Sequence, residues 1–158
     1  MLVSLNDTDK KILDALQQNC DLTNMELATK VGLSTAPCWR RVKRMEDMGL
    51  ITRRVALINQ KKLDLDIIVY ASIKLSSHTE EALEIFESTI VTYPEVTECY
   101  TISGGMDYMI RVITRDMKTY ENFLRKKLLK MDMVHEIHSR FAVTKIKYTT
   151  AIPLELST

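Results

Sequence analysis

Few side chains in this sequence of 158 residues are spaced for catalysis or metal binding. The thiols and imidazoles, which supply many nucleophiles, bases and metal ligands, are scattered singly along the chain: Cys20, Cys38, Cys99, His78, His135 and His138. No two cysteines have the close spacing of a zinc site, and their odd number does not suit a disulfide framework. We therefore expect no metal, no cofactor and no enzyme activity.

A basic stretch is the clearest chemical signal in the chain. Between positions 40 and 54, six residues are arginine or lysine and only Glu46 and Asp47 are acidic, whereas the whole chain has a net charge of +1. A concentrated basic stripe in a nearly neutral chain favours a polyanionic partner such as double-stranded DNA. The alternative is a basic helix face that is simply solvated.

The overall composition is that of an ordinary globular protein. Hydrophobic residues make up 46% and charged residues 27% of the sequence, which is a typical balance. No segment approaches the roughly 18 uncharged apolar residues of a membrane span. The N-terminus also lacks the basic and apolar regions of a secretory signal. We expect a cytoplasmic protein with no membrane partner.

The N-terminal residues carry the caps and the periodicity of helices. Asn6 or Asp7 can cap a first helix that ends near residue 20. Thr23 and Glu26 have the spacing of a capping box at the start of a second helix. Gly32 can adopt the left-handed conformation that ends this helix.

A third helix follows after a tight turn. Ser34 is its N-cap residue, Pro37 lies in its first turn and Gly49 ends it. Two short helices joined by a glycine-containing turn predict a helix-turn-helix. The stripe of the third helix that we expect to face the core is formed by Cys38, Val42 and Met45.

The opposite face of the third helix is the predicted DNA-reading surface. A recognition helix places its N-terminal residues near base edges and its cations near phosphates. This hypothesis requires the cations to point away from carboxylates of their own chain, and about four of them per subunit would contact phosphates. Together with one arginine beyond the helix, the predicted DNA-binding residues are Ser34, Thr35, Ala36, Trp39, Arg40, Lys43, Arg44 and Arg53.

The residues after the third helix change their pattern. Residues 49–58 have a β-like pattern and predict a wing or a short linker strand, and the polar residues 59–66 predict a linker. The predicted domains are therefore a DNA-binding domain over 1–58 and a C-terminal domain over 67–158.

Strands and helices alternate in the C-terminal half. The predicted elements are strand 67–75, helix 79–93, strand 96–103, strand 107–114, helix 116–130 and strand 134–148. This β-α-β-β-α-β order is that of a ferredoxin-like unit, whose helices cover one face of an antiparallel sheet. Because the other face must also be covered, we expect a homodimer. The predicted fold class is α+β, with an N-terminal winged helix-turn-helix and a C-terminal ferredoxin-like βαββαβ domain.

Six segments, in this order along nearly the whole chain, resemble the Lrp/AsnC family of transcriptional regulators, also called leucine-responsive or feast/famine regulators. These segments are Leu5–Leu13, Glu26–Ser34, Pro37–Arg44, Pro94–Tyr100, Ser103–Tyr108 and Lys147–Leu154.

The resemblance implies regulation by a small amino-acid effector that binds between dimers. It also implies that homodimers assemble to higher multiples, with an octamer as the expected form. Asp107 would meet the ammonium group of the ligand or fix its own loop, and the N–H groups of the two glycines would take a carboxylate. The effector-binding residues implied are Ser103, Gly104, Gly105, Asp107, Tyr108, Ser139 and Arg140. The alternative for residues 104–107 is a plain hairpin turn.

Two departures from the family pattern leave alternatives open. Arg53-Arg54 replaces a common Gly-Tyr pair beside the predicted wing, and Asp132-Met133 replaces Pro-Gly before the last strand, beside the implied effector site. One alternative function is a ligand-independent architectural DNA binder. A second is an amino-acid-handling enzyme on a dimeric ferredoxin-like sheet, which is disfavoured because no acid, base or nucleophile set converges.

Overall fold

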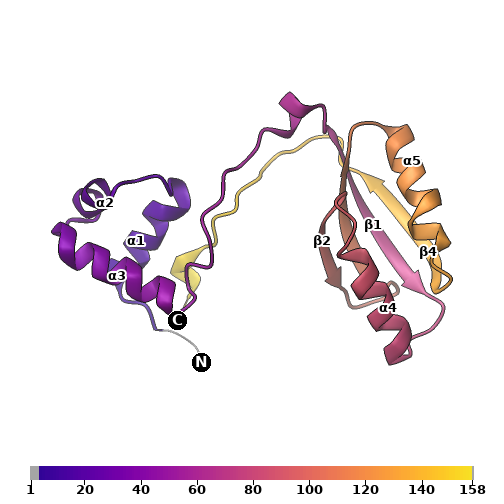
Figure 1. Cartoon of the computed structure of the whole chain (residues 1–158), viewed down its shortest axis with the longest axis horizontal. Helices are drawn as coiled ribbons and strands as arrows, with labels where there is room; N and C mark the ends of the chain where they lie inside the picture. Colours follow the sequence, from indigo (N-terminus) through magenta and orange to yellow (C-terminus); the bar gives the residue numbers. More distant parts are fainter. Residues whose placement is uncertain (1–3, 158) are drawn as a thin grey trace. The chain divides into compact units, whose positions relative to one another are not determined.

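The chain forms a helical unit and a sheet unit. The computed structural model describes residues 4–157. The first unit contains the residues up to Leu57 together with those from Lys147 onward, and the second unit spans Ile58–Ile146 (Figure 1).

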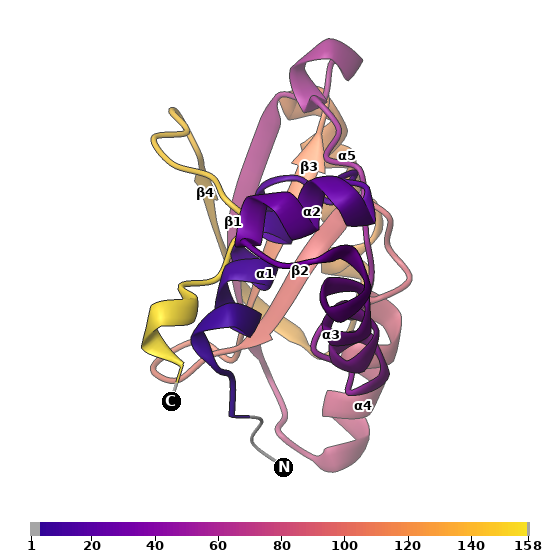
Figure 2. The same ribbon diagram turned by 90° about the vertical axis from the view of Figure 1, so that its left-hand side faces the viewer.

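Three short helices build the first unit: α1 (Asp7–Gln18), α2 (Asn24–Val31) and α3 (Thr35–Asp47) (Figure 2). The side chain of Asn6 caps α1 by accepting the N–H of Asp9. Thr23 and Glu26 form the predicted capping box of α2. Gly32 ends α2 with a φ of 73°, a left-handed conformation that glycine adopts without strain. The predicted helix-turn-helix is confirmed.

The core of the first unit is drawn from all three helices and from the C-terminal end of the chain. Its buried side chains are Ile12, Leu13, Ala15, Leu27, Ala28, Cys38, Val42, Met45 and Leu154. Leu154 belongs to the 3-10 turn η3 (Leu154–Leu156), which lies beside α1 in both views of the chain (Figures 1 and 2). Lys10 Nζ donates to the carbonyl of Ser157 at 2.9 Å, which adds a polar contact to this packing.

The second unit is a four-stranded antiparallel sheet with two helices. Its elements are β1 (Ile67–Leu75), α4 (Glu80–Ile90), β2 (Val96–Thr101), β3 (Tyr108–Thr114), α5 (Met117–Lys126) and β4 (Val134–Phe141). The strand order is β2-β3-β1-β4. Because β3 lies between the strands that flank α4, the unit is a split βαβ arrangement. The predicted ferredoxin-like topology is confirmed.

The two faces of the sheet differ. One face packs against α4 and α5 and holds an apolar core that includes Val69, Phe86 and Phe123. Tyr70 pairs with Arg111 on one side and with Arg140 on the other, so these three side chains share the opposite face. Neither helix of the second unit supplies a core residue to that opposite face.

Two predicted strands are shorter or missing. Residues 50–58 form no strand, and β4 ends at Phe141 instead of continuing to 148. A β-strand needs a neighbouring strand to bond its main-chain groups, and none of the main-chain hydrogen bonds within residues 4–157 involves residues 52–58. The β-like segment therefore has no strand partner among residues 4–157.

The C-terminal residues differ from their predicted domain. We expected 67–158 to form one domain, but residues from Lys147 onward belong to the first unit. The side chain of Gln17 on α1 bonds both main-chain groups of Ile152, accepting the N–H at 2.7 Å and donating to the carbonyl at 3.2 Å. The burial of Leu154 and these two bonds hold the C-terminal residues in the first unit. The sequence did not predict this placement, because neither contact can be inferred from a local pattern. The predicted linker holds the 3-10 turn η1 (Gln60–Leu63).

Candidate nucleic-acid interface and ligand site

The helix α3 is fixed to the first unit by its apolar side. Cys38 and Met45 are fully buried and Val42 nearly so. This burial was predicted from their helical spacing of four and three residues. Ser34 takes the N-cap position without a side-chain capping bond. Its hydroxyl is thus uncommitted at the end of the helix that would face a groove.

The N-terminal part of α3 is open to solvent. Ser34, Thr35 and Ala36 are exposed, and Trp39 retains 50% of its surface. Arg40 is exposed and has no hydrogen bond or ion pair with any residue from 4 to 157. These five exposed side chains all lie at the N-cap or in the first turns of α3.

The other cations of α3 are bound to carboxylates of their own chain. Arg44 Nη2 lies 2.6 Å and Arg41 Nη1 2.9 Å from the two oxygens of Asp9, and Lys43 Nζ lies 2.9 Å from Asp47. Our expectation that the helix cations would all point away from such groups is wrong for Lys43 and Arg44. The side chains of both remain about half exposed, 53% and 52%, so each still has N–H donors on the surface.

Asp9 is the residue that sequence reasoning missed. Its carboxylate is 1% exposed, and a buried carboxylate requires compensating charge. A signal for it exists, because Asp9 precedes the buried Ile12 and Leu13 by three and four residues. An acid on the apolar stripe of an amphipathic helix indicates a buried charge with an unseen partner.

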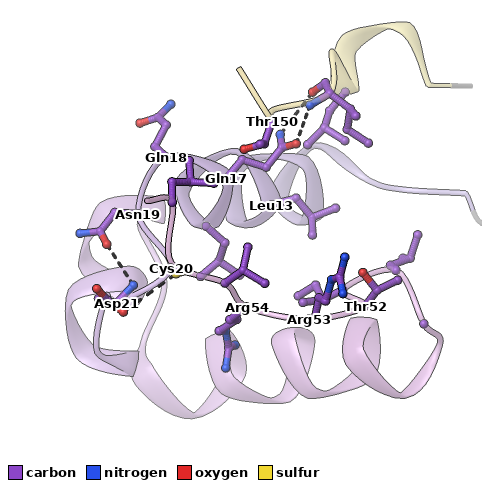
Figure 3. A pocket seen from close by; sticks show the side chains of 18 of the residues that line it. Leu13, Gln17, Gln18, Asn19, Cys20, Asp21, Thr52, Arg53, Arg54 and Thr150 are labelled. Carbon is purple, nitrogen blue, oxygen red and sulfur yellow. Dashed lines mark hydrogen bonds between the residues drawn. The ribbon is translucent and has the colours of Figure 1, made fainter. Parts of the chain in front are cut away.

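The two arginines beyond α3 have different environments. Arg54 Nη2 pairs with Glu46 at 2.8 Å, whereas Arg53 is exposed and has no ion pair within the described residues. Both belong to a segment that borders a surface hollow of about 1270 Å³ in the first unit. The far side of this hollow is formed by Gln17 on α1 and by Thr150 in the C-terminal segment (Figure 3).

The glycine turn between β2 and β3 is held from one side by Asp107. The N–H of Ile102 donates to the Asp107 carbonyl at 2.9 Å, and the carboxylate accepts the N–H of Leu75 at 2.7 Å and lies 2.9 Å from His78 Nε2. The Leu75 N–H, and then His78, lower the pKa of Asp107 below its usual value. These bonds tie Asp107 to the end of β1, to His78 and to Ile102. Gly104, with a φ of 116°, and the neighbouring Ser103 and Gly105 are exposed.

The remaining implied effector residues do not converge on that turn within one chain. Tyr108 is 2% exposed and donates to Glu87 on α4 at 2.7 Å. Ser139 lies within 2.6 Å of the Tyr120 hydroxyl on α5, whereas Arg140 donates to Ser72 on the opposite sheet face. These two strand residues pair about four positions from Leu75 along β1, a separation of roughly 13 Å.

Other chemistry is not brought together. Within residues 4–157 the three cysteines are free thiols, and no group of three His, Cys, Asp or Glu side chains is placed to hold a metal ion. Burial raises the pKa of Cys38 and Cys99, which keeps these thiols protonated at neutral pH. None of the helices described is both long enough and apolar enough to cross a bilayer.

The fold and the exposed helix define the class of protein. A helix-turn-helix unit followed by a ferredoxin-like unit is the architecture of a DNA-binding regulator with a separate sensing domain. Residues 5–52 match the winged helix-turn-helix DNA-binding family, and residues 68–152 match the Lrp/AsnC ligand binding domain. The chain belongs to the Lrp/AsnC family of transcriptional regulators.

Curated relatives and solved structures are similar to this protein over nearly the whole chain. The DNA-binding transcriptional activator DecR of Escherichia coli K12 is 37% identical over 151 residues, covering 96% of this chain and 99% of the relative. A crystal structure of an AsnC family regulator from Agrobacterium tumefaciens has a TM-score of 0.92 and 42% identity, covering 96% and 98% of the two chains. A Neisseria meningitidis regulator solved in complex with L-methionine has a TM-score of 0.92 and 34% identity, covering 96% and 97%.

Proposed function

We propose that the protein regulates transcription in the cytoplasm through reversible, non-enzymatic binding of double-stranded DNA by α3 and the segment after it. The observation that carries this proposal is the exposed face of α3, whose buried back leaves Trp39 and Arg40 uncommitted. The proposed DNA-contacting residues are Ser34, Thr35, Ala36, Trp39, Arg40, Lys43, Arg44 and Arg53. Arg40 and Arg53 have no competing carboxylate within residues 4–157, so they are the strongest candidates for new ionic contacts.

The test is the salt dependence of binding to a random-sequence DNA duplex. Binding to such a duplex comes from phosphate contacts, and each phosphate neutralised contributes about 0.9 to the slope of log K against log salt. We expect Arg40→Ala and Arg53→Ala each to weaken binding and to reduce the slope by about one per bound chain. Fluorescence anisotropy at several KCl concentrations measures both quantities.

Arg115→Ala is the matched control, because Arg115 is an exposed arginine of the second unit with no hydrogen bond or ion pair among the described residues. It removes the same charge far along the sequence from α3 and should leave the slope unchanged. If Arg40→Ala and Arg53→Ala behave like this control, the assignment of α3 as the DNA-contacting surface is refuted.

We propose further that an amino acid is the effector and that it binds at the exposed turn formed by Ser103, Gly104 and Gly105. Support comes from the match of residues 68–152 to a ligand binding domain and from the relative that was solved with L-methionine. Because Tyr108, Ser139 and Arg140 lie away from this turn within one chain, we propose that a complete pocket needs a second chain. Asp107 would act by holding the turn in shape.

A thermal-shift screen against the twenty amino acids tests the effector. A ligand present at about 100 times its Kd stabilises the native state by about 2.7 kcal/mol. Gly105→Val is the informative variant, because its φ is not positive and a Cβ there meets nothing within 4 Å. It should fold normally and lose the shift, whereas Lys118→Ala on α5 should retain it. If no amino acid shifts the wild type, the protein is a ligand-independent DNA binder, and turnover of any amino acid would favour the enzyme alternative.

We propose that the chain forms a homodimer through the sheet face that carries Tyr70 and Arg111, and that dimers assemble to a higher multiple such as an octamer. Tyr70 and Tyr100 keep 38% and 53% of their surface exposed on this face. An effector changes the assembly only if it binds one assembly state more tightly than another. Light scattering with and without the stabilising amino acid tests this, and a monomer at micromolar concentration would refute it.

A further inference from the structure

A cluster of three arginines on one side of α3 is organised by a buried acid. Arg40, Arg41 and Arg44, together with Pro37, line a surface hollow of about 290 Å³. These positions are spaced by three, four and seven residues, so they occupy one side of the helix. The cluster differs from a solvated basic patch, because two of its three members are held in place by Asp9.

The geometry of Asp9 leaves the arginines able to bind a second anion. Each carboxylate oxygen receives one N–H, from Arg41 Nη1 and Arg44 Nη2. A guanidinium has five N–H donors, so most donors of both side chains remain. Arg41 retains 33% and Arg44 52% of its side-chain surface, which places those donors at the rim of the hollow.

The charge of the cluster also favours an anion. Three guanidinium groups and one carboxylate leave a net charge of about +2, since arginine stays protonated at any working pH. The planar fork of arginine matches the oxygens of a phosphate. Holding two forks in advance reduces the side-chain entropy that is lost when an anion binds.

We propose that Asp9 is a positioning residue for DNA, and that Arg40, Arg41 and Arg44 form a subsite for a single backbone phosphate. This inference rests on the proposed DNA-binding function and adds to it the atom group that is bound and the buried acid that organises the site. Asp9 itself does not touch DNA. It holds the side chains of Arg41 and Arg44 in place. Arg40 lines the same hollow beside them.

The test is a pair of substitutions that change charge in the same way but differ in geometry. Asp9→Asn and Asp47→Asn each remove one negative charge near α3, and Asp47 pairs with Lys43 on the exposed side of the helix, 62% of its side chain being accessible. By Coulomb attraction alone, both variants should bind a random-sequence duplex as tightly as the wild type or more tightly. We expect Asp47→Asn to do so and Asp9→Asn to bind roughly tenfold more weakly, since charge-assisted hydrogen bonds to the phosphate lose their preorganised donors.

A second pair keeps the inference testable if Asp9→Asn does not fold. Arg41→Lys and Arg44→Lys preserve the charge and an ion pair to Asp9 but lose the planar fork. Each should weaken duplex binding several-fold while the fluorescence of Trp39 reports a folded first unit at the assay temperature. Arg115→Lys, an exposed arginine of the second unit, makes the same charge-neutral change outside the proposed DNA-contacting residues and should leave binding unchanged.

The outcomes separate this inference from the function on which it rests. If the wild type binds no DNA, or if Arg40→Ala and Arg53→Ala both behave like Arg115→Ala, the proposed function fails. If the wild type binds DNA and Arg40→Ala lowers the slope, but Asp9→Asn binds as tightly as Asp47→Asn and the lysine variants match the wild type, only the phosphate subsite is refuted.

Discussion

The C-terminal turn should contribute measurably to the stability of the DNA-binding unit. Leu154 is 6% exposed and packs in the core of α1, α2 and α3, although it is only four residues from the end of the chain. Replacing a buried leucine by alanine costs about 2–5 kcal/mol, and less where the site can collapse. A 3-10 turn of three residues can shift inward, so we expect Leu154→Ala to destabilise the first unit by about 2–3 kcal/mol.

The chain provides a reporter and a control for this prediction. Trp39 is the single tryptophan and lies on α3, so its emission during urea unfolding follows the first unit alone. With an m-value of about 1 kcal/mol/M for a small unit, the midpoint should fall by roughly 2–3 M. Leu156→Ala, at a position that is 77% exposed in the same turn, should change the stability by less than about 0.5 kcal/mol, which shifts the midpoint by less than about 0.5 M. Equal midpoints for the two variants would refute the view that this turn completes the core.

Three further predictions concern single interactions. Thr23→Ala removes half of the capping box of α2 and should destabilise the first unit by about 1 kcal/mol in the same fluorescence assay. The N–H of Leu75 lowers the pKa of Asp107 in the folded chain, so stability due to this carboxylate is present above about pH 4 and is lost as the pH falls further. Thermal melts followed by circular dichroism should therefore show that the deficit of Asp107→Asn shrinks between pH 5 and pH 2. Burial raises the pKa of Tyr108, so its contribution is complete below about pH 10 and falls above it. Wild type should lose more stability than Tyr108→Phe between pH 9 and pH 12.

Local features of the fold could be predicted because their partners are near in sequence. The capping box pairs Thr23 with Glu26, three residues apart, and Gly32 ends α2 by its own backbone conformation. The apolar stripe of α3 repeats at the helical period, so Cys38 and Met45 were assigned to the core without knowledge of what they touch. The ferredoxin-like topology of the second unit could likewise be predicted from the order of strand and helix patterns along the sequence.

Features that depend on distant partners could not be predicted from pattern alone. Asp9 meets its arginines 32 and 35 residues further along, and Leu154 joins a core formed by the first fifty residues. The orientation of the implied effector residues was predictable in part. Side chains alternate along a strand, so the neighbours Ser139 and Arg140 had to face opposite sides of the sheet, as they do.

The basic stripe shows why counting charges overstates a polyanion site. Of its six cations, Arg41, Lys43, Arg44 and Arg54 are paired with acids, which leaves Arg40 and Arg53 without a partner among residues 4–157. A count of exposed helix cations gave about four phosphate contacts per subunit. With a shared subsite at Asp9, the paired arginines act together with Arg40 on one phosphate, and Arg53 adds a second. The salt dependence per chain should then correspond to roughly two phosphates, so geometry, more than net charge, sets the affinity of this surface for DNA.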